Sequence, residues 1–203
     1  MIRVRVDGAD IIILPTVKGL VSEGEIAAEV IREVRPDAVG ISISKEELQA
    51  LRDKSIYGDY EMSTLEEVYA QKLSKFGEVE VPAPCYVSAM DVCEELGIPI
   101  IPLDMNDVEY TEAYCQKIRA TDMVRDSLFA RRAARVRFDL GSPLTFAKDW
   151  DRKVNRTKGF RQLQQDRERH MAATLLNMGR RYRRILAVIE AERADGVHAT
   201  IAK

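Results

Sequence analysis

The sequence predicts an α/β fold with a central, mostly parallel sheet of about four to six strands. Short, wholly apolar runs, which are typical of strands covered on both faces, occur at Ile11–Leu14, Val39–Ile43 and Ile185–Ile189. Amphipathic helical patterns lie between these runs, and this alternation is the order of elements in βαβ units. A chain of 203 residues that is 46% apolar is long enough to bury one full core. We therefore expect a single domain over residues 1–203.

The chain begins with the pattern of a β-hairpin. Ile2–Val6 alternates apolar residues with arginines, as a half-exposed strand does, and the Asp-Gly pair that follows is a turn signal. The next helix is expected from Ser22, which has the spacing of a capping box with Glu25, and its apolar stripe continues to Val34. This helix ends before Pro36, because the residue that precedes a proline is disfavoured in a helix.

Two more capping-box patterns predict the helices that follow the second buried strand. They start at Ser44 and at Ser63, and Ser55–Asp59 between them has no periodicity and is predicted to be a loop. A further apolar stripe predicts a helix at Tyr86–Leu96. Ile98–Leu103 is predicted to be another buried strand, in a position where the N–H donors missing from its two prolines are not needed.

The segment from about 107 to 159 is predicted to be a mainly helical insertion in the α/β domain. A break between its helices is expected from Gly141 to Trp150. The buried side of its first part is assigned to apolar residues at helical spacing, namely Ile118, Val124, Leu128 and Phe129.

The C-terminal part is predicted to be a long helix followed by a strand. The helix runs from about Phe160 to Arg183, and Ile185–Ile189 is the strand. The last apolar residues, Val197–Ile201, are expected to form a short strand or a frayed end.

The net charge of −2 conceals an uneven distribution of charge. Between Arg125 and Arg184 the chain has 17 lysines and arginines against 6 acidic residues, whereas the remainder has 14 against 27. Such asymmetry indicates either an anionic partner for the basic part or attraction between two parts of one fold. Aromatic residues lie among the basic ones, so nucleic-acid binding through residues 125–184 is one hypothesis. A solvated helical segment packed against an acidic body has the same composition.

Several common kinds of site have no signature in this sequence. The cysteines, Cys85, Cys93 and Cys115, are odd in number and lack a CxxC spacing, so neither a disulfide framework nor a zinc site is expected. There is no Gly-x-Ser-x-Gly elbow, no P-loop and no dinucleotide fingerprint, and we expect no cofactor. The apolar start is interrupted by charged residues and no run approaches a membrane span, which predicts a cytoplasmic protein without a membrane segment.

The loops after the predicted strands are where a site is expected. In parallel sheets, ligands bind beyond the carboxyl ends of the strands. Here the first two strands lead into Pro15–Val21 and Ser42–Glu46, and Asp104 follows the third. Lys18, Ser42 and Asp104 are therefore candidate site residues.

Three segments of the chain occur in the order found in a known family. They are TVKGLVSEGEIAAEVIREVRPDAVGISISKEELQAL, ELGIPIIPLD and QQDRERHMAATLLNMGRRYRRILAVIEAERADGV. Together they cover most of the chain and resemble the TraB/PrgY-like family, which belongs with the erythromycin esterase, ChaN and TIKI proteins. The resemblance implies an erythromycin esterase/ChaN-like α/β domain. It also implies descent from proposed hydrolases in which histidine and glutamate hold a divalent metal or transfer protons.

The chain departs from this family at the motif residues. The family has a Gly-Thr-Ala-His motif after the first strand, and this chain has Pro-Thr-Val-Lys, ending at Lys18. The second strand usually presents a glutamate where this chain has Ser42, and the second Gly-x-x-His motif corresponds to Glu-Ala-Glu-Arg, ending at Arg193. Protonated lysine and arginine have no lone pair for a metal, so the resemblance implies that the metal site has been lost.

The resemblance also implies a set of pocket residues. It retains Thr16, Asp104 and Arg167. The full candidate pocket combines the strand ends with residues of the last helical segments: Thr16, Lys18, Ser42, Asp104, Arg167, Glu190 and Arg193. Fixed cations would replace the charge of the metal and hold a small anionic ligand, so the implied function is a catalytically degenerate binding or regulatory module. Alternatively, Lys18 and Arg193 are solvated or pair with Asp104 and Glu190.

A metal-dependent hydrolase of the peptidase or esterase kind is the alternative activity. It would use a rearranged site of Thr16, Asp104, Glu190 and His198, in which His198 takes the place of a lost motif histidine. The other histidine, His170, is assigned to the surface of the long helix. We expect a homo-oligomer that forms through the helical part.

Overall fold

The protein is built around one open β-sheet. The structure, a computed structural model, describes residues 1–53 and 61–203. Within these residues the sheet has five strands in the order β1-β2-β5-β3-β4, and only the β1–β2 pair is antiparallel. The predicted α/β class and the mostly parallel sheet are confirmed. The strands are β1 (Ile2–Val6), β2 (Ala9–Thr16), β3 (Ala38–Ile41), β4 (Ile100–Pro102) and β5 (Arg184–Glu190).

The predicted hairpin forms one edge of this sheet. Ile2 of β1 pairs with Ile13 of β2, and this register places the turn at Asp7 and Gly8. Both turn residues have a positive φ, 48° at Asp7 and 83° at Gly8. An Asp-Gly pair accepts this left-handed backbone more readily than other residue pairs, so the local sequence fixes the position of the turn.

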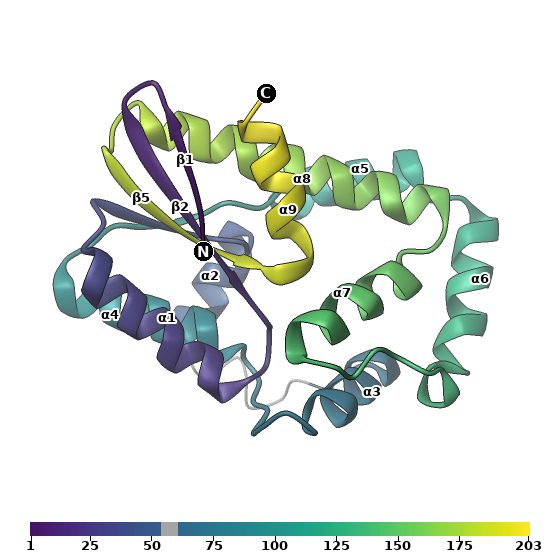
Figure 1. Cartoon of the computed structure of the whole chain (residues 1–203). Helices are drawn as coiled ribbons and strands as arrows, with labels where there is room; N and C mark the ends of the chain where they lie inside the picture. The colour runs from purple at the N-terminus through teal and green to yellow at the C-terminus, as the bar shows by residue number, and fades with distance from the viewer. Residues whose placement is uncertain (54–60) are drawn as a thin grey trace.

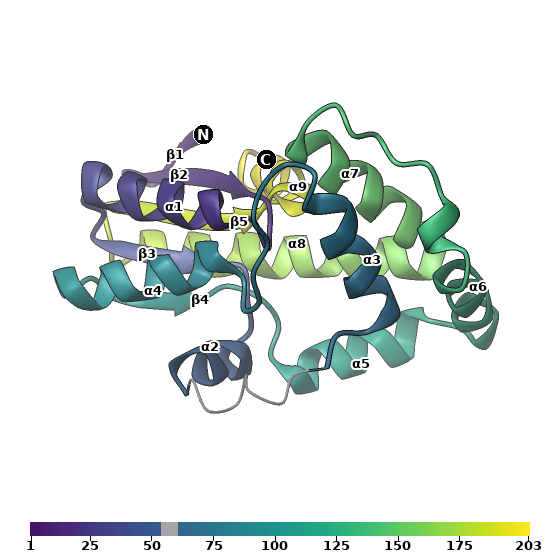
Figure 2. The ribbon, with the colours of Figure 1, turned by 90° about the horizontal axis from the view of Figure 1, so that it is seen from below.

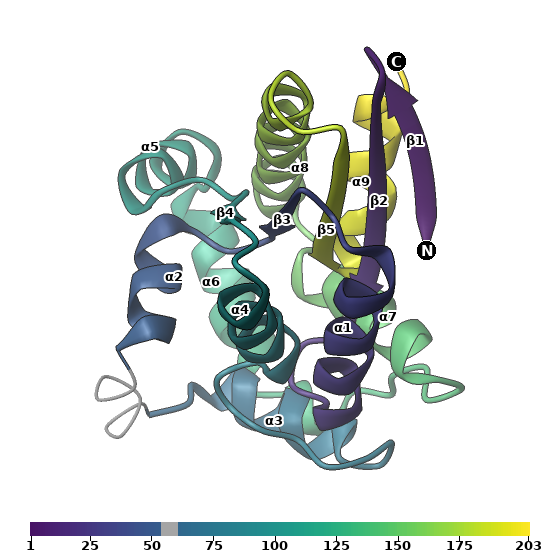
Figure 3. The same cartoon turned by 90° about the vertical axis from the view of Figure 1, so that its left-hand side faces the viewer.

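Helices cover both faces of the sheet (Figures 1 and 3). α1 (Val21–Val34) and α4 (Pro84–Leu96) pack on one face. α8 (Lys158–Gly179) and α9 (Ala191–Ile201) pack on the other. A sheet that is covered twice needs strands that are apolar on both sides, which explains the continuous apolar runs in the sequence.

The central strand, β5, contributes to the core on both faces. Leu186 and Val188 belong to the cluster under α1 and α4. The alternate residues Ile185, Ala187 and Ile189 belong to the cluster under α8 and α9. Since β5 pairs in parallel with both β2 and β3, its carboxyl end lies between theirs.

The remaining helices extend the molecule from the carboxyl edge of the sheet. Figure 2 shows α3, α5, α6 and α7 beyond the ends of the strands. The bounds are α2 (Lys45–Arg52), α3 (Thr64–Leu73), α5 (Asp107–Lys117), α6 (Ala120–Ala130), the short 3₁₀ helix η2 (Ala133–Arg135) and α7 (Pro143–Val154). α2 and α3 begin with the predicted capping boxes at Ser44 and Ser63.

The break predicted at Gly141–Trp150 is wrong, because α7 begins at Pro143. The Ser142 hydroxyl caps this helix, and Pro143 occupies the first turn, where proline is favoured. Trp150 lies inside α7, and its ring packs against that of Tyr69 on α3, with 5.3 Å between the centroids. The glycine and proline mark the start of a helix that the aromatic residues then hold in place.

The strand or frayed end predicted at Val197–Ile201 is also wrong, since these residues form the end of α9. Ala194, Val197 and Ile201 recur at helical spacing and are buried. A short apolar run does not distinguish a strand from a buried helical turn. Glu190 ends β5 and immediately precedes α9, so no loop separates this strand from its helix.

Two smaller corrections concern helices in the basic part of the chain. α8 ends at Gly179 and not at Arg183. Val124 and Leu128, which we assigned to a buried side, are 60% and 48% exposed, whereas Phe129 is buried. α6 therefore presents apolar side chains to solvent.

Two further expectations concern a loop and the presence of a membrane-spanning helix. The loop predicted at Ser55–Asp59 lies outside the described residues. Across residues 1–53 and 61–203, no helix combines the length and hydropathy that spanning a membrane requires.

Candidate functional site

The carboxyl ends of β2, β3 and β5 bring three of the candidate residues together. Thr16 pairs in register with Glu190, the last residues of β2 and β5. Ser42 follows β3 directly, and its hydroxyl accepts a hydrogen bond from the Glu190 backbone N–H at 3.0 Å. Parallel strands end at one edge, so residues far apart in the sequence meet there.

The hydroxyl groups of Ser42 and Thr16 at this edge both form hydrogen bonds within the protein. The Ser42 hydroxyl also lies 2.8 Å from that of Tyr86, and the Thr16 hydroxyl donates to the Ile189 carbonyl at 3.4 Å. Burial raises the pKa of Tyr86 well above its ordinary value, so this phenol stays protonated. Thr16 thus joins β2 to β5, and Ser42 joins the end of β3 to α4.

Lys18 forms an ion pair with Glu190, with 3.3 Å between Nζ and Oε1. The Glu190 carboxylate raises the pKa of Lys18 above its ordinary value, so the ammonium remains protonated. Burial opposes ionisation of Glu190, but the cations of Lys18 and Arg167 lower its pKa below the ordinary range. The Lys18 side chain is 39% exposed, against 8% for Glu190, so the ammonium is the accessible member of this pair.

Arg167 on α8 connects the ends of β4 and β5. Its Nε donates to Asp104 Oδ2 at 2.9 Å, a second nitrogen also contacts this oxygen, and that nitrogen lies 3.8 Å from Glu190 Oε1. Asp104 in turn accepts a bond from the Met105 backbone N–H at 2.8 Å. Six of the seven candidate residues therefore form one continuous set of contacts around Glu190.

Arg193, the seventh candidate, pairs with residues outside this set. Its guanidinium donates to Glu168 of α8 at 2.8 Å and contacts Asp151 of α7. The side chain is only 4% exposed. Arg193 thus joins α9 to α7 and α8, where its charge is matched by two carboxylates.

A cleft of about 550 Å³ opens beside these ion pairs, and we call it the edge cleft. Lys18 and Tyr86 line it next to the sheet. The rest of its wall is largely aromatic and aliphatic, with Met62, Leu65, Tyr69, Trp150 and Val154 among the lining residues. A concave, mostly apolar site of this size with few polar groups is typical of small-molecule binding.

Glu192 is the functional candidate that the sequence did not reveal. It lies in the first turn of α9, lines the edge cleft, and has a buried Oε2 with no hydrogen-bond partner in the described part of the chain. Burial, reinforced by the nearby Glu190 carboxylate, raises the pKa of Glu192 to about 7. This carboxyl group therefore changes its charge near neutral pH.

The potential nucleophiles near the cleft are in unreactive protonation states. Burial raises the pKa of Cys85 to about 12, so its sulfur is a thiol at neutral pH. Lys18 is protonated, and the Ser42 hydroxyl has Tyr86 and the Glu190 amide as its hydrogen-bond partners, with no histidine among its contacts in the described residues.

The edge cleft is also lined by the carboxylates of Glu47, Glu66 and Glu80.

The rearranged site centred on His198 is not assembled. His198 follows Glu190 by eight residues on α9, which corresponds to roughly 12 Å along the helix axis. No hydrogen bond or ion pair joins His198 to Thr16, Asp104 or Glu190 within residues 1–53 and 61–203. Over the same residues, no group of three or more histidines, cysteines, aspartates and glutamates is placed to hold a metal ion.

Comparison of the chain with models of known protein families finds no match, and comparison with curated proteins finds no relative. The TraB/PrgY-like resemblance therefore stays a prediction that rests on the residues themselves.

Proposed function

We propose that the protein is a binding module that captures a small molecule in the edge cleft. The observation that carries this proposal is the cleft itself, about 550 Å³ of mostly aromatic and aliphatic surface at the carboxyl edge of a parallel sheet. Tyr69 and Trp150 supply flat apolar surface, and Lys18 and Glu192 supply polar groups. The degenerate TraB-like module implied by the sequence resemblance is a protein of this kind.

The ligand that suits this cleft has an apolar or aromatic body and one acidic group. The Lys18 ammonium has three donors. Within the described residues one of them bonds Glu190, which leaves donors for a carboxylate or a similar oxygen acid. Protonated Glu192 would donate a second hydrogen bond. Glu47, Glu66 and Glu80 also line the cleft, and their charge opposes a ligand with several negative groups.

Binding is favoured over catalysis by the state of the reactive groups. A nucleophile needs a depressed pKa or an effective adjacent base. The pKa values of Cys85 and Lys18 are both raised, and the Glu190 carboxylate beside Lys18 is a weak base because its own pKa is lowered. The alternative hydrolase needs His198 beside Glu190, and these residues are two helical turns apart. Ester or peptide hydrolysis that a chelator abolishes would favour the hydrolase instead.

Calorimetric titration with phenylacetate and phenylacetamide tests the proposal. The two probes share a ring and differ in charge, and we expect the acid to bind about tenfold more tightly than the amide. Lys18→Met should remove this preference while leaving amide binding in place. Lys75→Met, which removes an exposed lysine outside the cleft, is the matched control and should behave as wild type. Absence of binding by both probes would contradict the proposal.

A further inference from the structure

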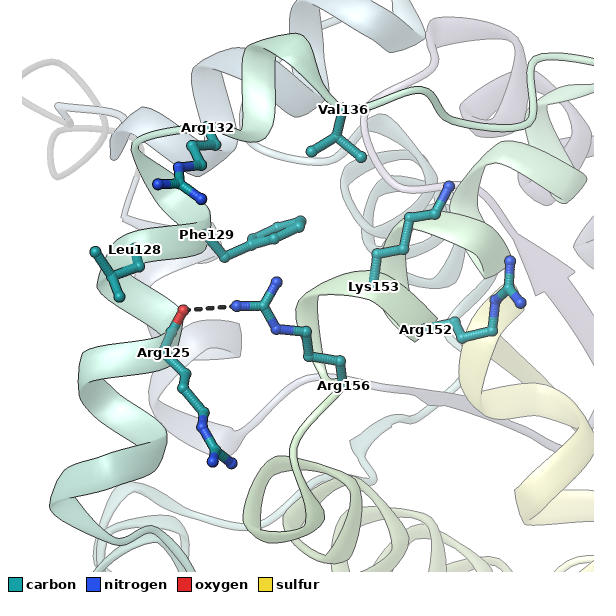
Figure 4. A pocket seen from close by; sticks show the side chains of 8 residues that line it. All are labelled: Arg125, Leu128, Phe129, Arg132, Val136, Arg152, Lys153 and Arg156. Carbon is teal, nitrogen blue, oxygen red and sulfur yellow. Dashed lines mark hydrogen bonds between the residues drawn. The ribbon is translucent and has the colours of Figure 1, made fainter.

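A second cleft, on the side of the molecule away from the sheet, is lined by cations. It has a volume of about 570 Å³ and lies between α6, η2 and α7 (Figure 4). We call it the arginine cleft; its charged residues are Arg125, Arg132, Arg152, Lys153 and Arg156. Leu128, Phe129 and Val136 form the apolar part of its lining. Two separate segments, residues 125–132 and 152–156, thus bring positive charge to one cleft.

Most of these cations have no carboxylate partner. Arg152 and Lys153 share Asp149, which is 7% exposed. Arg125, Arg132 and Arg156 form no ion pair with any residue in the described ranges, although the Arg156 charge acts on Asp126 and opposes the rise in pKa that burial gives this carboxyl group. Three of the five cations therefore have no ion-pair partner within the described ranges, unlike the cations around Glu190.

The guanidinium of Arg156, at the centre of this cleft, is held by an aromatic ring and a backbone carbonyl. Arg156 stacks over the Phe129 ring at 4.7 Å and donates to the Arg125 carbonyl at 2.8 Å, as Figure 4 shows. Lys153 lies over the Phe138 ring at 5.0 Å and donates to the Arg137 carbonyl at 2.6 Å, in addition to its ion pair with Asp149. Side chains that are already ordered lose less entropy when a ligand binds.

We infer that the arginine cleft binds the phosphate chain of a single-stranded nucleic acid. Guanidinium groups match phosphate geometry, and a planar arginine also offers a face on which a base stacks. The positive charge continues outside the cleft, at the exposed side chains of Arg131, Arg135, Lys158 and Arg161. Several cations in one cleft, with further exposed cations close to them in the sequence, fit a chain of phosphates better than an isolated phosphate group. This inference does not depend on the function proposed for the edge cleft.

Fluorescence anisotropy with a labelled oligothymidylate of about 20 nucleotides tests the inference. The full-length protein should bind it, and affinity should fall steeply between about 50 and about 200 mM salt. Arg132→Gln and Arg156→Gln should each weaken binding about tenfold at low salt and reduce the salt slope by about one. Arg132 is exposed, and its side chain forms no hydrogen bond or ion pair within the described residues. Its replacement should therefore leave the fold intact even if replacement of Arg156 disturbs α6.

Arg181→Gln is the matched control. Arg181 is exposed in the same basic part of the chain but lies after α8, away from the arginine cleft, and its replacement should change affinity less than about twofold. An equal loss in Arg181→Gln and Arg132→Gln would overturn the inference, because binding would then follow overall charge. Absence of binding would also overturn it. So would binding of inorganic tripolyphosphate, sensitive to Arg132→Gln, by a protein that does not bind the oligonucleotide.

Discussion

At the residue scale, Glu190 is the carboxylate on which the ion pairs of the sheet edge depend. Its side chain is 8% exposed and interacts with both Lys18 and Arg167. Its low pKa reflects those two cations acting against burial. Removing one member of a buried charge cluster leaves the others partly unpaired, which costs more than the pair itself contributes.

Glu190→Gln should therefore lower the free energy of unfolding by about 2 kcal/mol, as measured by urea denaturation. The expected loss of stability is moderate, because Arg167 keeps its ion pair with Asp104 and the Lys18 ammonium is partly exposed to solvent. Glu95→Gln removes an exposed partner of Arg32 and should cost about 0.5 kcal/mol or less. Equal effects of the two substitutions would show that the ion pairs of Glu190 stabilise the fold no more than an exposed pair does.

Glu192 gives a prediction about pH. Burial raises the pKa of Glu192 to about 7, above its value of 4.5 in an unfolded chain. Between these two pH values the folded state therefore keeps a proton that the unfolded state has released. Stability should consequently fall as pH rises through this range. Glu192→Gln removes the ionisation and should raise the free energy of unfolding by about 1–3 kcal/mol at about pH 8, with little effect below about pH 5.

Urea denaturation of wild type and Glu192→Gln across this pH range measures the difference directly. Glu33→Gln, which replaces an exposed glutamate on α1, provides the control and should leave the pH dependence unchanged. A constant difference between Glu192→Gln and wild type at all pH values would contradict the assignment.

At the scale of elements, α8 packs closely against the end of α5 through Gly159. A Cβ at this position would lie 2.6 Å from the Lys117 carbonyl oxygen and 2.9 Å from Asp122 Oδ2. The obstructing carbonyl belongs to the backbone and cannot rotate away. The contact between these helices therefore requires glycine.

Gly159→Ala should lower the free energy of unfolding by about 2 kcal/mol, because the overlap outweighs the gain in helix propensity. Thermal denaturation of the variant checks this. Gly141→Ala introduces a methyl group at an exposed position, 3.2 Å from a side-chain oxygen, and should change stability by about 0.5 kcal/mol or less. If Gly159→Ala is as stable as wild type, α5 and α8 are not packed as described.

The elements also show what the sequence can and cannot reveal. Strand ends in a parallel sheet meet, so the meeting of Thr16, Ser42 and Glu190 follows from the order of the apolar runs. The directions of the side chains after Glu190 could not be predicted, because no residue pattern indicates that α9 starts immediately after β5. The family resemblance assigns Arg193 to the pocket, whereas in the structure Glu192 lines the edge cleft and Arg193 pairs with Glu168 and Asp151.

The residues that form the walls of the edge cleft could not be predicted from the sequence for a related reason. Trp150 reaches the cleft only because α7 is a helix that packs against Tyr69 of α3. The glycine and proline before α7 favoured a break. Tertiary aromatic packing of this kind joins residues far apart in the sequence and has no local signature.

At the scale of the whole molecule, the uneven charge has two outcomes. Some of the basic part pairs with the acidic remainder, as in Arg167 with Asp104 and Lys148 with Asp195. In the described part of the chain, Arg125, Arg132 and Arg156 form no ion pair, and Arg152 and Lys153 share one carboxylate, so the arginine cleft keeps a positive charge. Internal attraction thus accounts for part of the asymmetry, and an external anion is the partner we infer for the rest.

Homo-oligomer formation through the helical part is a further prediction at this scale. Met123, Val124 and Leu128 on α6 are all at least 48% exposed, and apolar groups gathered on one helix favour association. We expect sedimentation velocity to detect a dimer or larger species that Leu128→Glu converts to monomer, whereas Leu144→Glu, at another exposed leucine, should not. A wild-type protein that is monomeric at high concentration would contradict this expectation.

The most direct test of the binding function is the fluorescence of Trp150 during titration with phenylacetate. Trp150 is the only tryptophan in the chain and lines the edge cleft, so its emission reports occupation of that cleft. We predict a saturable change that phenylacetate produces at lower concentration than phenylacetamide and that weakens as pH rises above about 7, where Glu192 loses its proton. Emission that neither probe alters, with the protein folded, would contradict the account.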